Sequence, residues 1–183
     1  EKSKHHSNEN DPELLKIVNS ANVACGYHAG DEQTMQEVVK ISKENNVSIG
    51  AHPSFKDPEN FGRKRMDLSA SEITKLVTDQ YEILQNIASL QGEKVSHIKP
   101  HGALNNMACE DLELATTLAK TIYHIDKDII YLVPTGSKME IAAKKLNMKI
   151  ACEIFADRNY EDDGTLVSRT KDHALITDPN QAK

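Results

Sequence analysis

The chain has 183 residues with a formal net charge of −6, and 38% of the residues are hydrophobic and 27% charged. This length suits one domain that can bury a sizeable core. The acidic balance argues against a nucleic-acid-binding surface, and no apolar run reaches the roughly 18 residues of a membrane span. We therefore expect a soluble globular protein with neither nucleic acid nor a membrane as its partner.

Residues 1–10 are polar and unpatterned, so we predict a flexible N-terminal loop there and a single domain over residues 11–183. Asp11 and Pro12 predict the start of a short helix over residues 11–21. Runs of apolar residues predict strands at 22–26, 47–51, 95–99, 129–133 and 148–155, and two short extended pieces at 165–168 and 173–177.

Helical periodicity fills the intervals between these strands. Asp31 is the predicted N-cap of a helix that runs to residue 45, and Ser69 with Glu72 forms a predicted capping box for the next helix. Further helices are predicted at 110–123 and 137–147. The segment KPHGALNN, which follows the third strand, is predicted to be a loop.

The alternation of strands and helices predicts an α/β fold with a parallel sheet. The sequence has neither GxGxxG after the first strand nor GxxxxGK(S/T), so both nucleotide-binding fingerprints are absent. Polar residues follow several strands, which favours a (β/α) barrel over a doubly wound sheet. A full barrel takes about 250 residues, so about six βα repeats indicate a truncated, barrel-like domain.

Three cysteines, Cys25, Cys109 and Cys152, are widely spaced and form no CxxC pair. This pattern indicates neither a zinc knuckle nor a disulfide framework, and it fits a reducing, cytoplasmic setting. Cys25 and Cys152 lie in apolar stretches, where we expect small core residues and not nucleophiles.

Four apolar runs break into clusters of glycine, histidine, proline and charged residues, at 22–31, 47–54, 95–104 and 150–158. The carboxyl ends of parallel strands meet at one edge, so these clusters can converge on one site. The candidate catalytic residues are His28, Asp31, His52, Lys99, His101 and Glu153, and the candidate substrate-binding residues are Lys99, Arg63, Asp157 and Arg158.

Some of the candidate histidines and acids also have a structural alternative. His28 lies between two glycines that permit close approach of a ligand, whereas Asp31 is expected to cap a helix in any case. His52 follows a strand and precedes a proline, and it either serves as a ligand or base or hydrogen-bonds a neighbouring loop. His101 is a candidate acid or base.

The charged candidates can bind an anion or pair with one another. Lys99 ends an apolar strand, where a partly buried lysine needs an anionic ligand or an ion pair with Glu153 or Asp157. Arg158 can bind a carboxylate or pair with Asp157. Arg63 lies in a basic loop that is either an anion-binding lip or an ordinary solvated loop.

Four stretches carry a family resemblance: SANVACGYHAGD, IGAHPSF with NFGRKRMDLS, HIKPHGALNN, and EIFADRNYEDDGTLVSR. Together they resemble the LamB/YcsF family, to which the A subunit of prokaryotic 5-oxoprolinase belongs. Family chains usually begin with a DLNxDLGE-like strand, of which only Glu1 could remain here, and continue into a CVHGD-like segment. The resemblance therefore predicts truncation at both ends. Asn105 stands where the family usually has tyrosine.

The resemblance implies a barrel-like fold of the glycoside hydrolase and deacetylase type. It implies ATP-dependent opening of 5-oxoproline to L-glutamate, with ATP and Mg²⁺ as cofactors and subunits B and C as partners. In that scheme Lys99 and Arg158 hold the substrate carboxylate or the phosphate, one of the histidines moves the proton, and Asp31, Glu153 or Asp157 holds a metal or acts as base.

Two other functions fit the same residues. One is a metal-dependent deacetylase or amidohydrolase that acts alone, with a metal ion on His28 and His52. The other is a non-catalytic subunit that binds the substrate.

Overall fold

The computed structural model describes residues 11–162, 164–178 and 180–181. Its centre is one parallel sheet in the order β1-β2-β3-β4-β5, made of β1 (Ser20–Ala24), β2 (Ser48–His52), β3 (Val95–Ile98), β4 (Ile130–Pro134) and β5 (Ile150–Glu153). Each strand pairs with the next one in the chain, whereas a doubly wound sheet reverses its strand order. The predicted parallel, barrel-like α/β fold is confirmed.

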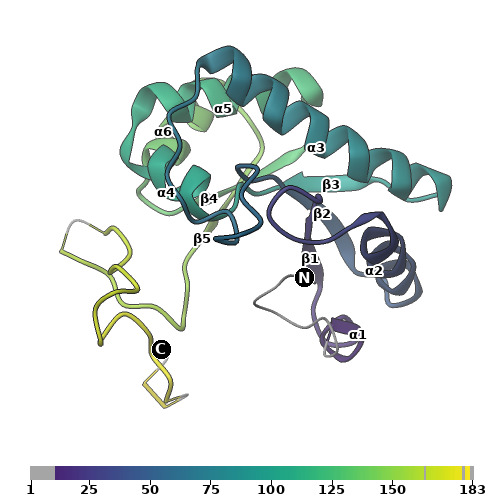
Figure 1. Ribbon diagram of the computed structural model, residues 1–183, viewed down its shortest axis with the longest axis horizontal. Helices are drawn as coiled ribbons and strands as arrows, with labels where there is room; N and C mark the ends of the chain where they lie inside the picture. The colour runs from purple at the N-terminus through teal and green to yellow at the C-terminus, as the bar shows by residue number, and fades with distance from the viewer. Residues whose placement is uncertain (1–10, 163, 179, 182–183) are drawn as a thin grey trace.

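Helices connect the strands and cover the sheet (Figure 1). They are α1 (Asp11–Leu14), α2 (Glu32–Glu44), α3 (Ala70–Leu90), α4 (Gly102–Glu110), α5 (Leu112–Ile125) and α6 (Lys138–Lys145). Asp31 caps α2 by accepting from the Thr34 N–H at 2.8 Å, and Ser69 and Glu72 form the predicted capping box of α3. Within the part of the chain that the structure describes, no helix is both long and apolar enough to cross a membrane.

The two faces of the sheet differ in polarity. Alternate residues of a strand point to opposite faces, and one set packs with the helices into the main core: Val23, Ile49, Ala51, Ile98, Tyr131 and Val133. The other set is Asn22, Gly50, His52, His97, Lys99 and Glu153. Helices therefore seal the apolar face, and the opposite face carries the polar residues.

Several expectations from the sequence are wrong in detail. The first helix is one turn long, and residues 165–168 and 173–177 form only the isolated bridges Tyr160–Leu166 and Arg158–Leu175. Cys152 is exposed because β5 is paired on one side only, whereas Cys25 is buried as expected. The predicted flexible loop 1–10 lies outside the described residues.

The segment expected to be a loop after β3 instead begins α4 at Gly102. Glycine and two asparagines signal a turn, but here the helix buries Ala103, Leu104 and Ala108 against the core. Gly102 has a φ of +58°, and a Cβ there would lie 2.4 Å from the carbonyl oxygen of Gly62. Glycine is therefore needed for packing against the loop 53–68, not for ending the helix.

Candidate active site

Three histidines from three strand ends lie against one another. His28 follows β1, His52 ends β2, and His101 follows β3. The rings of His28 and His101 stack with centroids 4.1 Å apart and planes 11° apart, and the His52 ring lies 4.8 Å from that of His101. His28 is fully buried and His52 is 8% exposed. The sequence-predicted convergence of these histidines is present in the fold.

A line of hydrogen bonds runs through two of these rings. His52 Nδ1 lies 2.6 Å from the Lys99 carbonyl oxygen, His52 Nε2 lies 3.0 Å from His101 Nδ1, and His101 Nε2 lies 2.9 Å from the Phe61 carbonyl oxygen. Carbonyl oxygens only accept, so the three bonds need three protons, whereas two neutral imidazoles carry two. Satisfying the whole line places one additional proton on the His52–His101 pair.

The loop 53–68 holds the Phe61 carbonyl in place. Gln80 of α3 is fully buried, and its side chain forms two hydrogen bonds with the backbone of this loop. Its Oε1 accepts from the Ser54 N–H at 3.0 Å, and its Nε2 donates to the Ser54 carbonyl at 2.8 Å. Gly62 has a φ of +67°, and a Cβ there would meet Ser54 Oγ at 2.1 Å and His28 Cβ at 3.0 Å. The loop can therefore approach the histidines only with glycine at this position.

An ion pair joins the ends of β3 and β5. Lys99 Nζ lies 2.7 Å from Glu153 Oε2, and the two side chains are 13% and 18% exposed. The Phe155 ring lies below the ammonium group, 4.7 Å from Nζ to the ring centroid. Glu153 Oε1 is buried and has no hydrogen-bond partner among the described residues. Of the two anionic partners that the sequence left open for Lys99, the structure selects Glu153.

Lys99 connects the ion pair to the histidines. Its carbonyl oxygen is bonded to His52 Nδ1, while its side chain pairs with Glu153. The carboxyl edge of the sheet therefore carries an ammonium, a carboxylate and two hydrogen-bonded imidazoles within one bonded network. This combination can bind a polar group, neutralise developing negative charge and deliver a proton.

His97 is a buried polar residue that no sequence pattern singles out. It lies one level below Lys99 on the same face of β3, over Gly50 of the neighbouring strand. The Ser96 hydroxyl donates to the Ile49 carbonyl at 3.0 Å, so it accepts from His97 Nδ1, also at 3.0 Å. Burial, together with the charge of Lys99, lowers the pKa of His97 and so favours the neutral ring. The pairing of Gly50 with His97 across β2 and β3 identifies this residue as one that packs closely against the neighbouring strand. This pairing follows from the strand register, which cannot be read from the sequence.

The remaining candidates lie at the margin of this network. Asp31 accepts from the Thr34 N–H and hydroxyl at the start of α2, so its cap role is confirmed. Arg63 is exposed, with its guanidinium carbon 5.1 Å from the centroid of the Phe61 ring. Its expected substrate-binding role stays a prediction.

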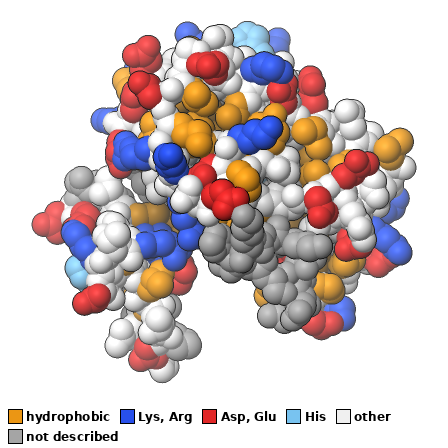
Figure 2. All heavy atoms as spheres, in the orientation of Figure 1, with side chains coloured by type: hydrophobic (Ala, Val, Ile, Leu, Met, Phe, Trp, Pro, Cys, Tyr) orange, Lys and Arg blue, Asp and Glu red, His pale blue; other side chains and the backbone are white. Residues whose placement is uncertain are grey.

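Arg158 serves the segment that follows β5. Its guanidinium donates to the Val167 carbonyl at 2.7 Å and to the Ala174 carbonyl at 3.3 Å. Burial, followed by the charge of Arg169, lowers the pKa of Arg158, and the charge of Arg63 acts in the same direction. Figure 2 shows Lys and Arg side chains gathered where this segment meets the main body. Substrate binding by Arg158 and by the exposed Asp157 stays a prediction.

No group of three or more His, Cys, Asp or Glu side chains is placed to hold a metal ion among the residues that the structure describes. The contacts of His52 at both ring nitrogens also occupy the positions that a metal ion would use. A metal on His28 and His52 stays a prediction.

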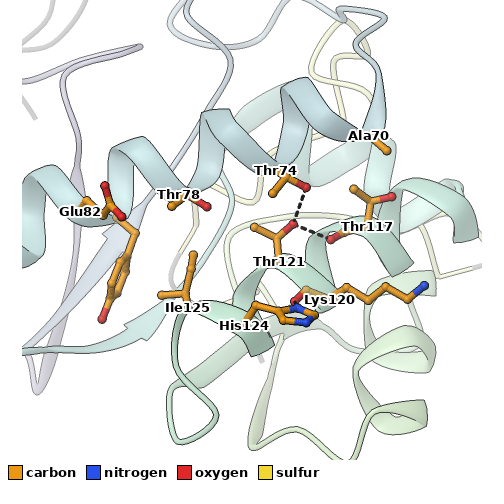
Figure 3. Close-up of a pocket in the computed structure, with 10 residues that line it drawn as sticks. Ala70, Thr74, Thr78, Glu82, Thr117, Lys120, Thr121, His124 and Ile125 are labelled. Carbon is orange, nitrogen blue, oxygen red and sulfur yellow. Dashed lines mark hydrogen bonds between the residues drawn. The ribbon is translucent and has the colours of Figure 1, made fainter.

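A hollow of about 660 Å³ lies away from the strand ends, between α3 and α5 (Figure 3). Thr74, Thr117 and Thr121 point toward one another there. The hydroxyls of Thr74 and Thr121 lie 3.0 Å apart, and Thr121 donates to the Thr117 carbonyl at 2.8 Å. None of the candidate residues lines this hollow.

Comparison with known proteins gives one consistent family. The family model described as "LamB/YcsF family" matches residues 1–183. A protein from Rhodopseudomonas palustris strain CGA009, named as the A subunit of 5-oxoprolinase, is 46% identical over 172 residues, which cover 93% of this chain and 68% of that protein. A protein of the same name from Clostridium beijerinckii is 46% identical over 172 residues, which cover 94% of this chain and 68% of that one.

A solved structure shares the fold. The crystal structure of a lactam utilization protein from Thermus thermophilus matches with a TM-score of 0.91 and 35% sequence identity. The match covers 100% of this chain and 74% of that one.

Proposed function

The chain belongs to the LamB/YcsF family, and from this premise we propose that it is the A component of a 5-oxoprolinase, which opens the lactam of 5-oxoproline to L-glutamate and hydrolyses ATP. The observation that carries the proposal is the Lys99–Glu153 ion pair, bonded through Lys99 to the His52–His101 pair at the carboxyl edge of the sheet. Parallel α/β enzymes place their reacting groups at this edge.

The proposed reaction overcomes the low reactivity of a lactam carbonyl. The γ-phosphoryl group of ATP is transferred to the lactam oxygen and ADP leaves. Water then attacks the activated ring carbon, the bond from this carbon to nitrogen breaks, and the nitrogen takes up a proton as it becomes the amine of glutamate. A second water releases the phosphate. The overall balance is one 5-oxoproline, one ATP and two waters to glutamate, ADP and phosphate.

The residues of the site suit these steps. The Lys99 ammonium stabilises negative charge on the lactam oxygen or the phosphoryl group. In this scheme the His52–His101 pair, whose line of hydrogen bonds is satisfied when it holds one additional proton, supplies the proton to the departing nitrogen. Arg63, at the edge of the histidine cluster, is a second cation for the substrate carboxylate or the phosphate.

The partners in the proposed assembly are subunits B and C. The relatives are named as the A component of their enzyme, which supports an assembly of several different chains. We assign no nucleotide site to this chain, since neither sequence fingerprint of such a site occurs in it. ATP dependence is carried over from the family resemblance.

The test is 5-oxoproline-dependent ATP hydrolysis by the full-length protein, with and without subunits B and C. We expect turnover only in the complete assembly, and we expect the Lys99→Ala variant to lose at least about 100-fold in kcat, since one charged stabilising contact is worth about 3 kcal/mol. Lys94→Ala, an exposed lysine at the other end of β3, is the matched control. Normal activity of Lys99→Ala would remove Lys99 from this role.

The same assay separates the other two functions. Hydrolysis without ATP by the chain alone would identify a stand-alone amidohydrolase. Binding of 5-oxoproline, with turnover that Lys99→Ala leaves unchanged in the assembly, would identify a binding subunit.

A further inference from the structure

We propose that the Lys99–Glu153 pair recognises the cis-amide edge of a cyclic amide, with Lys99 Nζ donating to the lactam oxygen and Glu153 Oε1 accepting from the lactam N–H. This inference rests on the proposed function and specifies how its substrate is selected. It assigns to Glu153 a role as a specificity-determining residue that contacts the substrate nitrogen.

The first observation is the unequal use of the Glu153 carboxylate. Its Oε2 accepts from Lys99 Nζ at 2.7 Å, whereas its Oε1 is buried without a partner in the described part of the chain. A buried acceptor that lacks a donor costs about 1–3 kcal/mol, and more when it is charged. Buried polar atoms are ordinarily hydrogen-bonded, so the unpartnered Oε1 is available for a donor that a ligand brings.

The second observation is that the described residues around Glu153 supply no such donor. Cys109 lies close by, and burial, assisted by the charges of Glu110 and Glu153, raises the pKa of its thiol to about 12; its S–H donates to Met139 Sδ at 3.7 Å and not to Glu153. Asn105 directs its amide nitrogen toward Cys109 Sγ at 3.8 Å, and its Oδ1 is a second buried acceptor that no described residue satisfies. Two unpartnered acceptors around one thiol favour a ligand that carries an N–H.

The third observation is the unused capacity of Lys99. An ammonium group has three donors, and the ion pair with Glu153 uses one of them. The Phe155 ring covers one side of the ammonium group, 4.7 Å from Nζ. The pair therefore presents an N–H donor and a carboxylate acceptor next to each other.

This donor–acceptor arrangement matches a lactam and not an open-chain amide. A five-membered ring forces the amide into the cis form, so the N–H and the C=O point to the same side. In an ordinary secondary amide the trans form is favoured by about 2.5–4 kcal/mol, and the two groups point in opposite directions. An open-chain amide can reach Lys99 or Glu153 but not both. A lactone keeps the C=O and lacks the N–H, so it can satisfy only Lys99.

The experiment compares two ligands that differ in that one group. Binding of 5-oxoproline and of its lactone analogue, 5-oxotetrahydrofuran-2-carboxylate, is measured by calorimetry without ATP, using the full-length protein in its complete assembly. A hydrogen bond to a charged acceptor is worth about 1.5–3 kcal/mol, so the wild type should prefer the lactam by about 10-fold or more.

The variant Glu153→Met removes the acceptor at similar side-chain length, and we expect the preference for the lactam to fall to within about twofold. Glu82→Gln, at an exposed acid in the middle of α3 and away from the strand ends, should leave the preference unchanged. If loss of the ion pair prevents folding, the double variant Lys99→Met with Glu153→Met leaves no unpaired buried charge and should show the same loss of preference.

The outcomes separate this inference from the proposed function. A lactam preference that survives in Glu153→Met overturns the role of Glu153, while binding of 5-oxoproline still supports the proposed function. Equal affinity of the wild type for the two ligands overturns the inference in the same way. Failure of the wild-type assembly to bind 5-oxoproline overturns both.

Discussion

Replacement of Gly50 by alanine is expected to destabilise the fold through a contact with His97. A Cβ at position 50 would lie 2.0 Å from His97 Nε2, 2.2 Å from Cδ2 and 2.6 Å from Cε1. Ordinary contacts between such atoms begin at about 3.5 Å, so the ring would have to move by about 1.5 Å. Gly50 does not have a positive φ, so the backbone itself accepts alanine.

The expected loss follows from two contributions. Overpacking of a well-filled interior costs about 1–3 kcal/mol, and displacement of the ring breaks its hydrogen bond to Ser96, which is worth about 1 kcal/mol. We expect Gly50→Ala to lower the free energy of unfolding by about 2–4 kcal/mol. The assay is equilibrium unfolding in urea, with Ser48→Ala on the exposed start of β2 as the control.

A double-mutant cycle with His97→Ala isolates the contact. If the ring is the obstacle, Gly50→Ala should cost at least about 1.5 kcal/mol less in the His97→Ala background than in the wild type. Without a clash, replacement of glycine by alanine stabilises a protein by about 0.4–1 kcal/mol. A neutral or stabilising Gly50→Ala, or strict additivity in the cycle, would refute the packing argument.

Three further predictions concern the supports of the site. Gln80→Leu leaves the buried N–H and C=O of Ser54 unpaired, so it should lower the free energy of unfolding, measured by urea titration, by about 2–4 kcal/mol. The control is Asn86→Ala at an exposed position of the same helix, which should change this free energy by less than about 0.5 kcal/mol. Arg158→Gln removes two bonds to backbone carbonyls and should speed limited proteolysis within residues 155–178; an unchanged cleavage pattern would contradict the anchoring role. Burial lowers the pKa of His97 in the folded state, so as the pH falls below about 6.5 this histidine is protonated in the unfolded chain before it is protonated in the folded protein. The free energy of unfolding should therefore decrease from about pH 6.5 down to the lower pKa of the folded state. His97→Gln should remove that part of the decrease below about pH 6.5, and an identical decrease in the variant would contradict it.

The strands and the convergence of the polar residues could be predicted from the sequence because both depend on short-range patterns. Apolar runs that end in clusters of glycine, histidine and charged residues identified the carboxyl ends of β1, β2, β3 and β5. The caps at Asp31 and Ser69 followed from local chemistry and are confirmed. The partial burial of Lys99 predicted either an anionic ligand or an ion pair with Glu153 or Asp157, and the structure contains the pair with Glu153.

The missed features depend on contacts between distant segments. The helix α4 replaces a predicted loop because Gly102 is required for approach to Gly62 and not for a turn. The close contact of His97 with Gly50 needs the register of β2 and β3, which the sequence does not reveal. The line of hydrogen bonds through His52 and His101 ends at the carbonyl of Phe61, which lies 40 residues before His101.

The most direct test of the site is a crystal structure of the full-length protein with 5-oxoproline bound. We predict the lactam oxygen within hydrogen-bonding distance of Lys99 Nζ and the lactam nitrogen within the same range of Glu153 Oε1, with the His52–His101 pair alongside. A 5-oxoproline molecule bound away from the carboxyl ends of β3 and β5, or bound there with its lactam edge turned away from both residues, would contradict the account.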